Sequence, residues 1–96
     1  MIASLTRYRR ATGVPSRTVA DRVILARPGR EDFDALTGAA VAVWNLLQEA
    51  RSEGELIETL AWAYQLPRSE IERDVHALIA DLLDRGVIEV GAAHDG

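Results

Sequence analysis

The chain has 96 residues, of which 48% are hydrophobic and 27% charged, and it carries a formal net charge of −4. This length suits one small domain, and the balance of apolar and charged residues argues against a disordered chain. The absence of cysteine excludes a disulfide framework, a thiol nucleophile and a cysteine-ligated zinc site. The longest nearly apolar run, Gly38 to Trp44, is too short to span a bilayer, so we expect a soluble cytoplasmic protein.

Charge is distributed unevenly along the chain. Residues 1–30 contain seven arginines and one acidic residue, a net charge of +6, whereas residues 31–96 contain four arginines and fourteen acidic residues, a net charge of −10. An arginine-rich start is typical of an arm that binds nucleic acid or an acidic partner, or of a solvated tail. We expect residues 1–13 to be a flexible segment, residues 14–90 to form the domain and residues 91–96 to be a flexible tail.

Three short strands are expected at the start of the domain, over residues 14–20, 22–27 and 31–36. Pro15 restricts the first of them to a sheet edge, because proline has no N–H to give to a neighbouring strand. The second is apolar with two β-branched residues, and a Pro-Gly turn separates it from the third. The third completes a hairpin, although Asp32 and Asp34 have low strand propensity.

Two helices are expected next, over residues 37–47 and 53–64. Apolar side chains recur in both at spacings of three and four residues, which is the helical period. Thr37 is the expected N-cap of the first helix, since its hydroxyl can accept a free backbone N–H. Ser52 and Glu55 have the S-x-x-E spacing of a capping box, which places the start of the second helix.

A third helix is expected over residues 67–85, with Ser69 and Glu72 repeating the capping-box spacing near its start. Gly86 is expected to end it by adopting the left-handed conformation. Residues 87–90 then form a terminal strand or an extended segment. The order of three antiparallel strands and three helices predicts an α+β domain of the winged helix-turn-helix-like class.

The sequence does not assemble the residues that catalysis needs. Of the two histidines, His76 lies one helical turn after Glu72, a spacing that favours a surface contact over a metal site. There is no nucleophile elbow and no glycine-rich phosphate loop. We therefore expect a protein that is not an enzyme and holds neither a metal nor a cofactor.

Three kinds of binding remain open from the residues. Between Pro67 and Val90 there are three arginines and six acidic residues, a balance that would repel a DNA duplex, so DNA binding would have to use the arginine-rich start. An open third strand could instead pair with an extended peptide, or with a second copy in a dimerising scaffold. In the plainest case, Phe33 and Leu36 simply seal the core under the hairpin.

Three runs match the pattern of a known family in the family's order and spacing: Leu36 to Leu47, Leu56 to Tyr64, and Ile71 to Ile88. The sequence resembles the PqqD-like family, also called RiPP recognition elements, from about Pro15 to Val90. Thr37 stands where the family usually has asparagine. Asp34 and Ala35 stand where many relatives have larger apolar or aromatic residues, which implies a shallower or more polar pocket.

The resemblance implies a peptide chaperone that binds the leader of a ribosomally synthesised precursor peptide. A separately encoded enzyme, such as a radical SAM maturase, a leader peptidase or a cyclase, would then modify the precursor, with no nucleic acid or membrane involved. The leader would add as an antiparallel strand to the third strand, at Asp32, Phe33, Asp34, Ala35 and Leu36. Its side chains would enter a groove beside the third helix, at Glu72, Asp74, Val75, His76, Leu78 and Ile79. Phe33, Val75 and Ile79 would supply apolar contact, and the acidic residues would pair with leader lysine or arginine.

Overall fold

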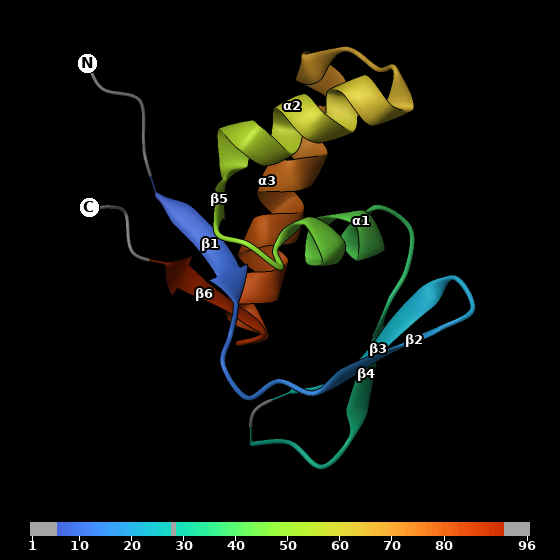
Figure 1. Ribbon diagram of the computed structural model, residues 1–96, viewed down its shortest axis with the longest axis vertical. Helices are drawn as coiled ribbons and strands as arrows, with labels where there is room; N and C mark the ends of the chain where they lie inside the picture. Colours follow the sequence, from blue (N-terminus) through green and yellow to red (C-terminus); the bar gives the residue numbers. More distant parts are fainter. Residues whose placement is uncertain (1–5, 28, 92–96) are drawn as a thin grey trace.

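The computed structural model describes residues 6–27 and 29–91 of the chain. In chain order the elements are β1 (Arg7–Arg10), β2 (Ser16–Val19), β3 (Arg22–Ala26), β4 (Phe33–Leu36), α1 (Ala39–Leu46), β5 (Arg51–Ser52), α2 (Glu53–Tyr64), α3 (Arg68–Asp84) and β6 (Ile88–Gly91). The strands form two antiparallel sheets, in the orders β5-β1-β6 and β2-β3-β4 (Figure 1). The expected α+β class is confirmed, as are the three strands that precede the three helices.

One hydrophobic core joins the helices to the β2-β3-β4 sheet. Val23 and Leu25 of β3 and Leu36 of β4 are at most 3% exposed, which sets one face of this sheet, its inner face, against the core. From the helices, the buried side chains include Trp44, Leu47, Leu56, Ile57, Leu60, Ile71, Val75, Ile79 and Leu82. Every fully buried residue among those described is apolar. No helix of the described ranges is long and apolar enough to cross a membrane.

The arginine-rich start contributes a strand, where the sequence suggested a flexible segment over residues 1–13. Its described part includes β1, which pairs with both β5 and β6. Arginine suits this place because its long stem packs on apolar surface while its guanidinium reaches polar partners. The guanidinium of Arg7 bonds Glu55 at 3.0 Å, and that of Arg9 bonds Glu89 at 2.8 Å. Residues 1–5 lie outside the described residues, as do residues 92–96 of the expected tail, whose first residue, Gly91, belongs to β6.

Both ends of the first helix have features that the sequence did not reveal. The prediction that Thr37 caps it is wrong: the N-cap is Gly38, at φ 59° and ψ −133°, and no side chain caps the helix. Such a positive φ favours glycine, which carries no Cβ. At the other end, Arg10 donates to the carbonyl oxygen of Trp44 at 2.9 Å and Arg51 donates to that of Leu46 at 2.8 Å. Two arginines from strands therefore satisfy the carbonyls at the C-terminal end of α1.

The second helix begins as the sequence predicts, and the third does not. In α2, the Ser52 hydroxyl accepts from the Glu55 N–H at 3.1 Å, and the Glu55 carboxylate accepts from the Ser52 N–H at 2.8 Å. The expected second capping box at Ser69 and Glu72 is wrong, because α3 starts one residue before Ser69 with Pro67 as its N-cap. Gly86, at φ 76°, follows the end of α3 in the expected left-handed conformation.

Replacing Arg10 by alanine is expected to lower the free energy of unfolding by about 1–3 kcal/mol. The substitution removes the hydrogen bond to the Trp44 carbonyl oxygen. It also removes the cation–π contact, in which the guanidinium carbon lies 4.5 Å from the centre of the Trp44 ring. Urea unfolding followed by Trp fluorescence and far-UV circular dichroism measures the change. Arg17→Ala in β2 is the matched control and should leave stability within about 0.5 kcal/mol. An equal loss in both variants would contradict the anchoring role of Arg10.

The stability that Glu55 supplies is expected to fade in acid. The Ser52 backbone N–H lowers the pKa of Glu55, Arg7 and Arg51 add to that lowering, and partial burial opposes it. A carboxyl with a lowered pKa in the fold stabilises above its ordinary pKa and loses this effect as pH falls through its folded value. Glu55→Gln should therefore be less stable than the parent at pH 7, with the difference shrinking towards pH 3. Urea midpoints across this range test it, and a difference independent of pH would contradict it.

Candidate functional site

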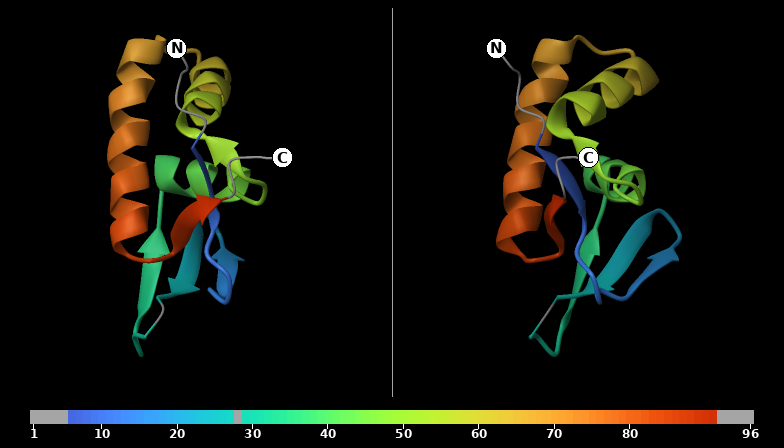
Figure 2. Two further views of the ribbon diagram at one scale, coloured as in Figure 1. Left: turned by 90° about the vertical axis from the view of Figure 1, so that its left-hand side faces the viewer. Right: turned by 60° about the vertical axis from the view of Figure 1, so that its left-hand side comes forward.

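The edge of β4 is the centre of the candidate site. In the order β2-β3-β4, β4 pairs with β3 on one side only, so its other edge is open among the described residues. On that side α3 stands beside it, and β4 rises along the C-terminal end of α3 towards the start of α1 (Figure 2). An open edge presents backbone N–H and C=O groups that an extended peptide can pair with.

The strand register identifies which peptide groups of β4 are free. The Ala26 N–H donates to the Pro15 carbonyl at 3.1 Å, so Ala26 faces β2 and its neighbour Leu25 faces β4. Because Leu25 is paired with Asp34, the peptide groups of Asp34 point towards β3. Those of Phe33 and Ala35 point the other way, to the open edge.

The same alternation separates the side chains of β4 onto two faces. Leu36 lies on the inner face in the core, with Asp34 on the same side, whereas Phe33 and Ala35 lie on the outer face. Phe33 is 70% exposed. Of the two residues considered as seals for the core, Leu36 therefore fills that role and Phe33 does not.

Beyond the end of β4, α3 lines an apolar hollow of about 440 Å³. Its walls come from the start of α1, the second half of α2 with the turn after it, and α3. The lining residues are Gly38, Ala39, Leu60, Tyr64, Leu66, Ile71, Asp74, Val75 and Leu78. The hollow begins two residues after β4 ends, since Gly38 and Ala39 form part of its wall. Asp74 is the charged residue of this lining, so the site combines apolar surface with one negative group.

The structure brings together some of the predicted site residues and leaves others apart. Asp74, Val75 and Leu78 line the hollow, while Glu72 and His76 are exposed outside it and Ile79 is buried in the core. The side chain of Phe33 is on the outer sheet face, away from the core that holds Val75 and Ile79. Asp32 precedes β4 and pairs with Arg30 at 3.3 Å.

Four large apolar lining residues were not among the predicted site: Leu60, Tyr64, Leu66 and Ile71. Tyr64 and Leu66 are 48% and 44% exposed, and they stand at the end of α2 and in the turn that follows. Apolar residues beside a turn were the available sequence signal, but helical periodicity alone assigns such residues to the core.

His76 has a different partner from the expected one. Its Nδ1 lies 3.0 Å from the Glu53 carboxylate at the start of α2, rather than beside Glu72 on its own helix. The packing of α2 against α3 brings Glu53 there. Within residues 6–27 and 29–91, no three histidine or acidic side chains gather as a metal site would require.

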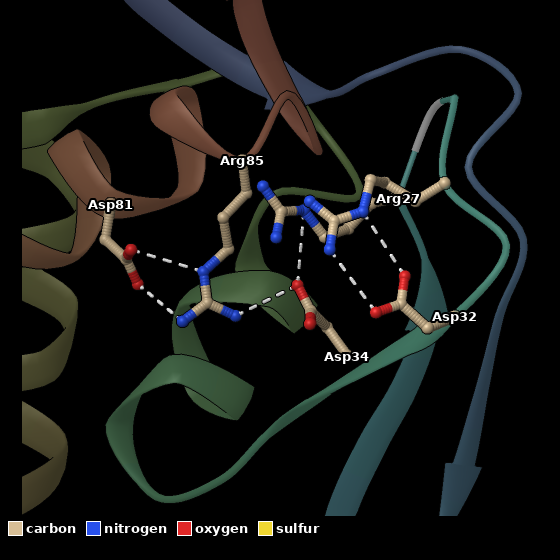
Figure 3. A network of polar contacts seen from close by, with 6 residues as sticks. Arg27, Asp32, Asp34, Asp81 and Arg85 are labelled. Atoms are coloured by element: carbon tan, nitrogen blue, oxygen red, sulfur yellow. Dashed lines mark hydrogen bonds and ion pairs between the residues drawn. The ribbon is translucent and has the colours of Figure 1, made fainter.

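A polar network ties β4 to the end of α3 (Figure 3). Arg85 donates to Asp34 at 3.3 Å and holds Asp81 through two nitrogens, at 3.2 and 3.0 Å. The Asp81 carboxylate, with burial opposing it and Asp34 adding to it, raises the pKa of Arg85. Arg27, the residue that follows β3, approaches Asp34 with its Nε at 3.5 Å. Asp34 is therefore occupied by two arginines of its own chain.

Comparison with known proteins gives one family and several relatives. The family model described as coenzyme PQQ synthesis protein D (PqqD) matches residues 22–88. A PqqA binding protein of Gluconobacter oxydans (strain 621H) is 41% identical over 51 residues, which are 53% of each chain. A PqqA binding protein of Rhodopseudomonas palustris (strain HaA2) is 43% identical over 49 residues, 51% of this chain and 48% of that one. The chain spans about half the length of the curated relatives it matches.

Two solved structures share the fold. One is TbiB1 in complex with the TbiA(β) leader peptide, with a TM-score of 0.76 and 23% identity over 88% of this chain and 98% of that one. The other is the solution structure of the PqqD truncation of Methylobacterium extorquens PqqCD, described as a stand-alone RiPP recognition element. Its TM-score is 0.70 at 26% identity, over 86% of this chain and 88% of that one.

Replacing Asp34 by alanine is expected to lower the free energy of unfolding by about 1–2 kcal/mol, because Arg27 and Arg85 then lose their shared carboxylate. Asp32→Ala is the matched control, since it removes a carboxylate that pairs with the exposed Arg30, and no measurable change is expected. Urea unfolding of the two variants makes the comparison. If both were as stable as the parent, the network would not hold β4 to α3.

Proposed function

The chain belongs to the PqqD family, whose model matches residues 22–88, and from this membership and the open edge of β4 we propose that it binds the leader of a ribosomally synthesised precursor peptide. The protein acts as a peptide chaperone and presents the bound precursor to a separate modifying enzyme, such as a maturase, a leader peptidase or a cyclase. Its own role is recognition, without catalysis.

The free peptide groups of Phe33 and Ala35 carry this proposal. A peptide that lies along β4 accepts from and donates to these two residues, as a further strand of the β2-β3-β4 sheet. All strand pairs in this sheet are antiparallel, and antiparallel pairing is the slightly more stable arrangement, so the peptide runs opposite to β4. Backbone pairing of this kind supplies affinity for many sequences.

The apolar hollow beside α3 supplies specificity for the sequence of the peptide. Since β4 runs towards Gly38 at the rim of the hollow, an antiparallel peptide passes the hollow first and leaves past Phe33. Residues just N-terminal to the paired segment therefore place an apolar side chain among Leu60, Ile71 and Leu78. Asp74 at the same hollow favours a lysine or arginine nearby in the leader.

The relatives support the same role. Two of them are PqqA binding proteins, and TbiB1 has been solved with a leader peptide. DNA binding is less well supported, because Arg7, Arg9 and Arg10 of the basic start are engaged by Glu55, Glu89 and Trp44 within the chain. The carboxylates of Glu55 and Glu89 offset the charge of Arg7 and Arg9, and Arg10 is held against Trp44, so β1 offers little free charge to phosphates.

Ala35→Pro is expected to weaken peptide binding at least tenfold while the protein stays folded. Proline removes the N–H that Ala35 points to the open edge and leaves the pairing of β4 with β3 intact. Asp34 would be the wrong position for this test, because its N–H faces β3. The measurement is a fluorescence-polarisation titration with the labelled N-terminal half of a candidate precursor peptide.

Thr18→Pro is the matched control for Ala35→Pro. Thr18 lies on β2, at the opposite edge of the same sheet, and the alternation turns its N–H outwards as well. The Thr18→Pro protein should bind the peptide as tightly as the parent does, and urea unfolding should show that both variants are folded. Unchanged affinity in a folded Ala35→Pro protein would contradict strand addition. Salt-sensitive binding of a DNA duplex, with no binding of the peptide, would favour the DNA alternative instead.

A further inference from the structure

The outer face of the β2-β3-β4 sheet is unusually apolar. It is defined by the side chains that alternate away from the core: Pro15, Arg17, Val19, Arg22, Ile24, Ala26, Phe33 and Ala35. A sheet with one face on the core normally shows polar residues on the other, yet six of these eight are apolar. Phe33 is 70% and Val19 46% exposed, and a hollow of about 490 Å³ lies between them over Ile24 and Pro15. Exposed apolar surface of this kind is typical of a protein contact.

The outer face also carries a cation without a partner. Arg17 lies opposite Ile24 in the sheet and lines the hollow. Within the described parts of the chain it makes no ion pair, whereas Arg22 of the same face contacts Asp21 at 3.8 Å. An unpaired guanidinium set in apolar surface suits a partner that brings a carboxylate surrounded by apolar side chains.

The peptide edge and the outer face meet in β4. Phe33 and Ala35 turn their peptide groups to the open edge and their side chains to the outer face. A strand added at that edge would extend the outer face by one strand, at a spacing of about 4.8 Å from β4. Every second side chain of the bound peptide would then stand beside Phe33 or Ala35. The loaded protein therefore presents a wider outer face than the free one.

We propose that the outer face, widened by the bound leader, is the docking surface for the modifying enzyme, whose contact patch is apolar with a carboxylate that meets Arg17. This inference rests on the proposed function and names the surface through which it is carried out. The precursor leaves β4 past Phe33, beside this face, so an enzyme docked there is next to the segment it modifies. A second copy fits poorly, because a two-fold contact pairs this face with itself, and the face has no carboxylate to meet Arg17.

Docking on a shared surface makes the two binding steps cooperative. The enzyme binds the loaded protein more tightly than the free protein, because the leader supplies part of the contact. By thermodynamic linkage, the enzyme must tighten leader binding by the same factor. Both factors are measurable on the same three purified components.

Arg17→Glu is the test of the docking surface. The probe is a purified candidate modifying enzyme for the precursor used in the leader titration, titrated by biolayer interferometry against the immobilised protein saturated with the leader peptide. Arg17→Glu is expected to weaken enzyme binding at least tenfold, and to leave the affinity for the leader within twofold because Arg17 is two strands from the open edge. Arg73→Glu makes the same charge change at an exposed position of α3 and should change enzyme binding less than twofold.

The outcomes separate this inference from the proposed function. If the parent protein does not bind the leader, the proposed function fails, and this inference fails with it. If the leader binds but the enzyme does not, or binds Arg17→Glu as tightly as the parent, the docking surface is overturned and leader binding stands. Enzyme binding that is equally tight with and without leader overturns the shared surface. A dimer of the parent that Arg17→Glu abolishes, seen by sedimentation equilibrium, assigns the face to a second copy and also overturns the proposal.

Discussion

The alternation of β4 is the constraint on which the site depends. Its two inward residues attach it to the rest of the protein, Leu36 through the core and Asp34 through Arg27 and Arg85. Its two outward residues, Phe33 and Ala35, need neither their side chains nor their peptide groups to hold β4 in place. A four-residue strand would not keep a straight, open edge without such fixation, because short edge strands have little stability of their own. Anchoring on one face thus preserves recognition on the other side of the same strand.

Arginines of the basic first third of the sequence, together with Arg51, stabilise the fold. Arg10 and Arg51 satisfy carbonyls at the end of α1, and Arg7 reaches the capping box of α2 through Glu55. Arginine is suited to this work because its planar group carries several donors on a long apolar stem. The strand β1 and its arginines therefore fix the first two helices, which form walls of the hollow beside α3. Three of the arginines therefore make contacts within the protein: Arg7, Arg10 and Arg51.

Local signals in the sequence predicted local structure well. The capping box at Ser52, the left-handed Gly86 and the strands around the Pro-Gly turn each depend on neighbouring residues, and each is confirmed. What the sequence could not give depends on distant pairing. The strand β1 forms by pairing with β6, which lies some eighty residues further along the chain. His76 contacts Glu53 because α2 and α3 pack together. The faces of β4 required the register with β3, which a pattern of Phe, Asp, Ala and Leu does not reveal.

The two faces of the sheet divide the information in a bound peptide. In the proposed complex, the paired side chains that point inwards would face α3, and the residues just before them would meet the hollow and Asp74, which favour apolar and basic residues. Those that point outwards face away from this protein and are left for whatever docks on Phe33, Val19 and Arg17. Successive residues of one extended peptide would thus be read by two different proteins, since the period of a strand is two. In the proposed complex, a leader could therefore change its outward residues with the enzyme while its inward residues remained fitted to this protein.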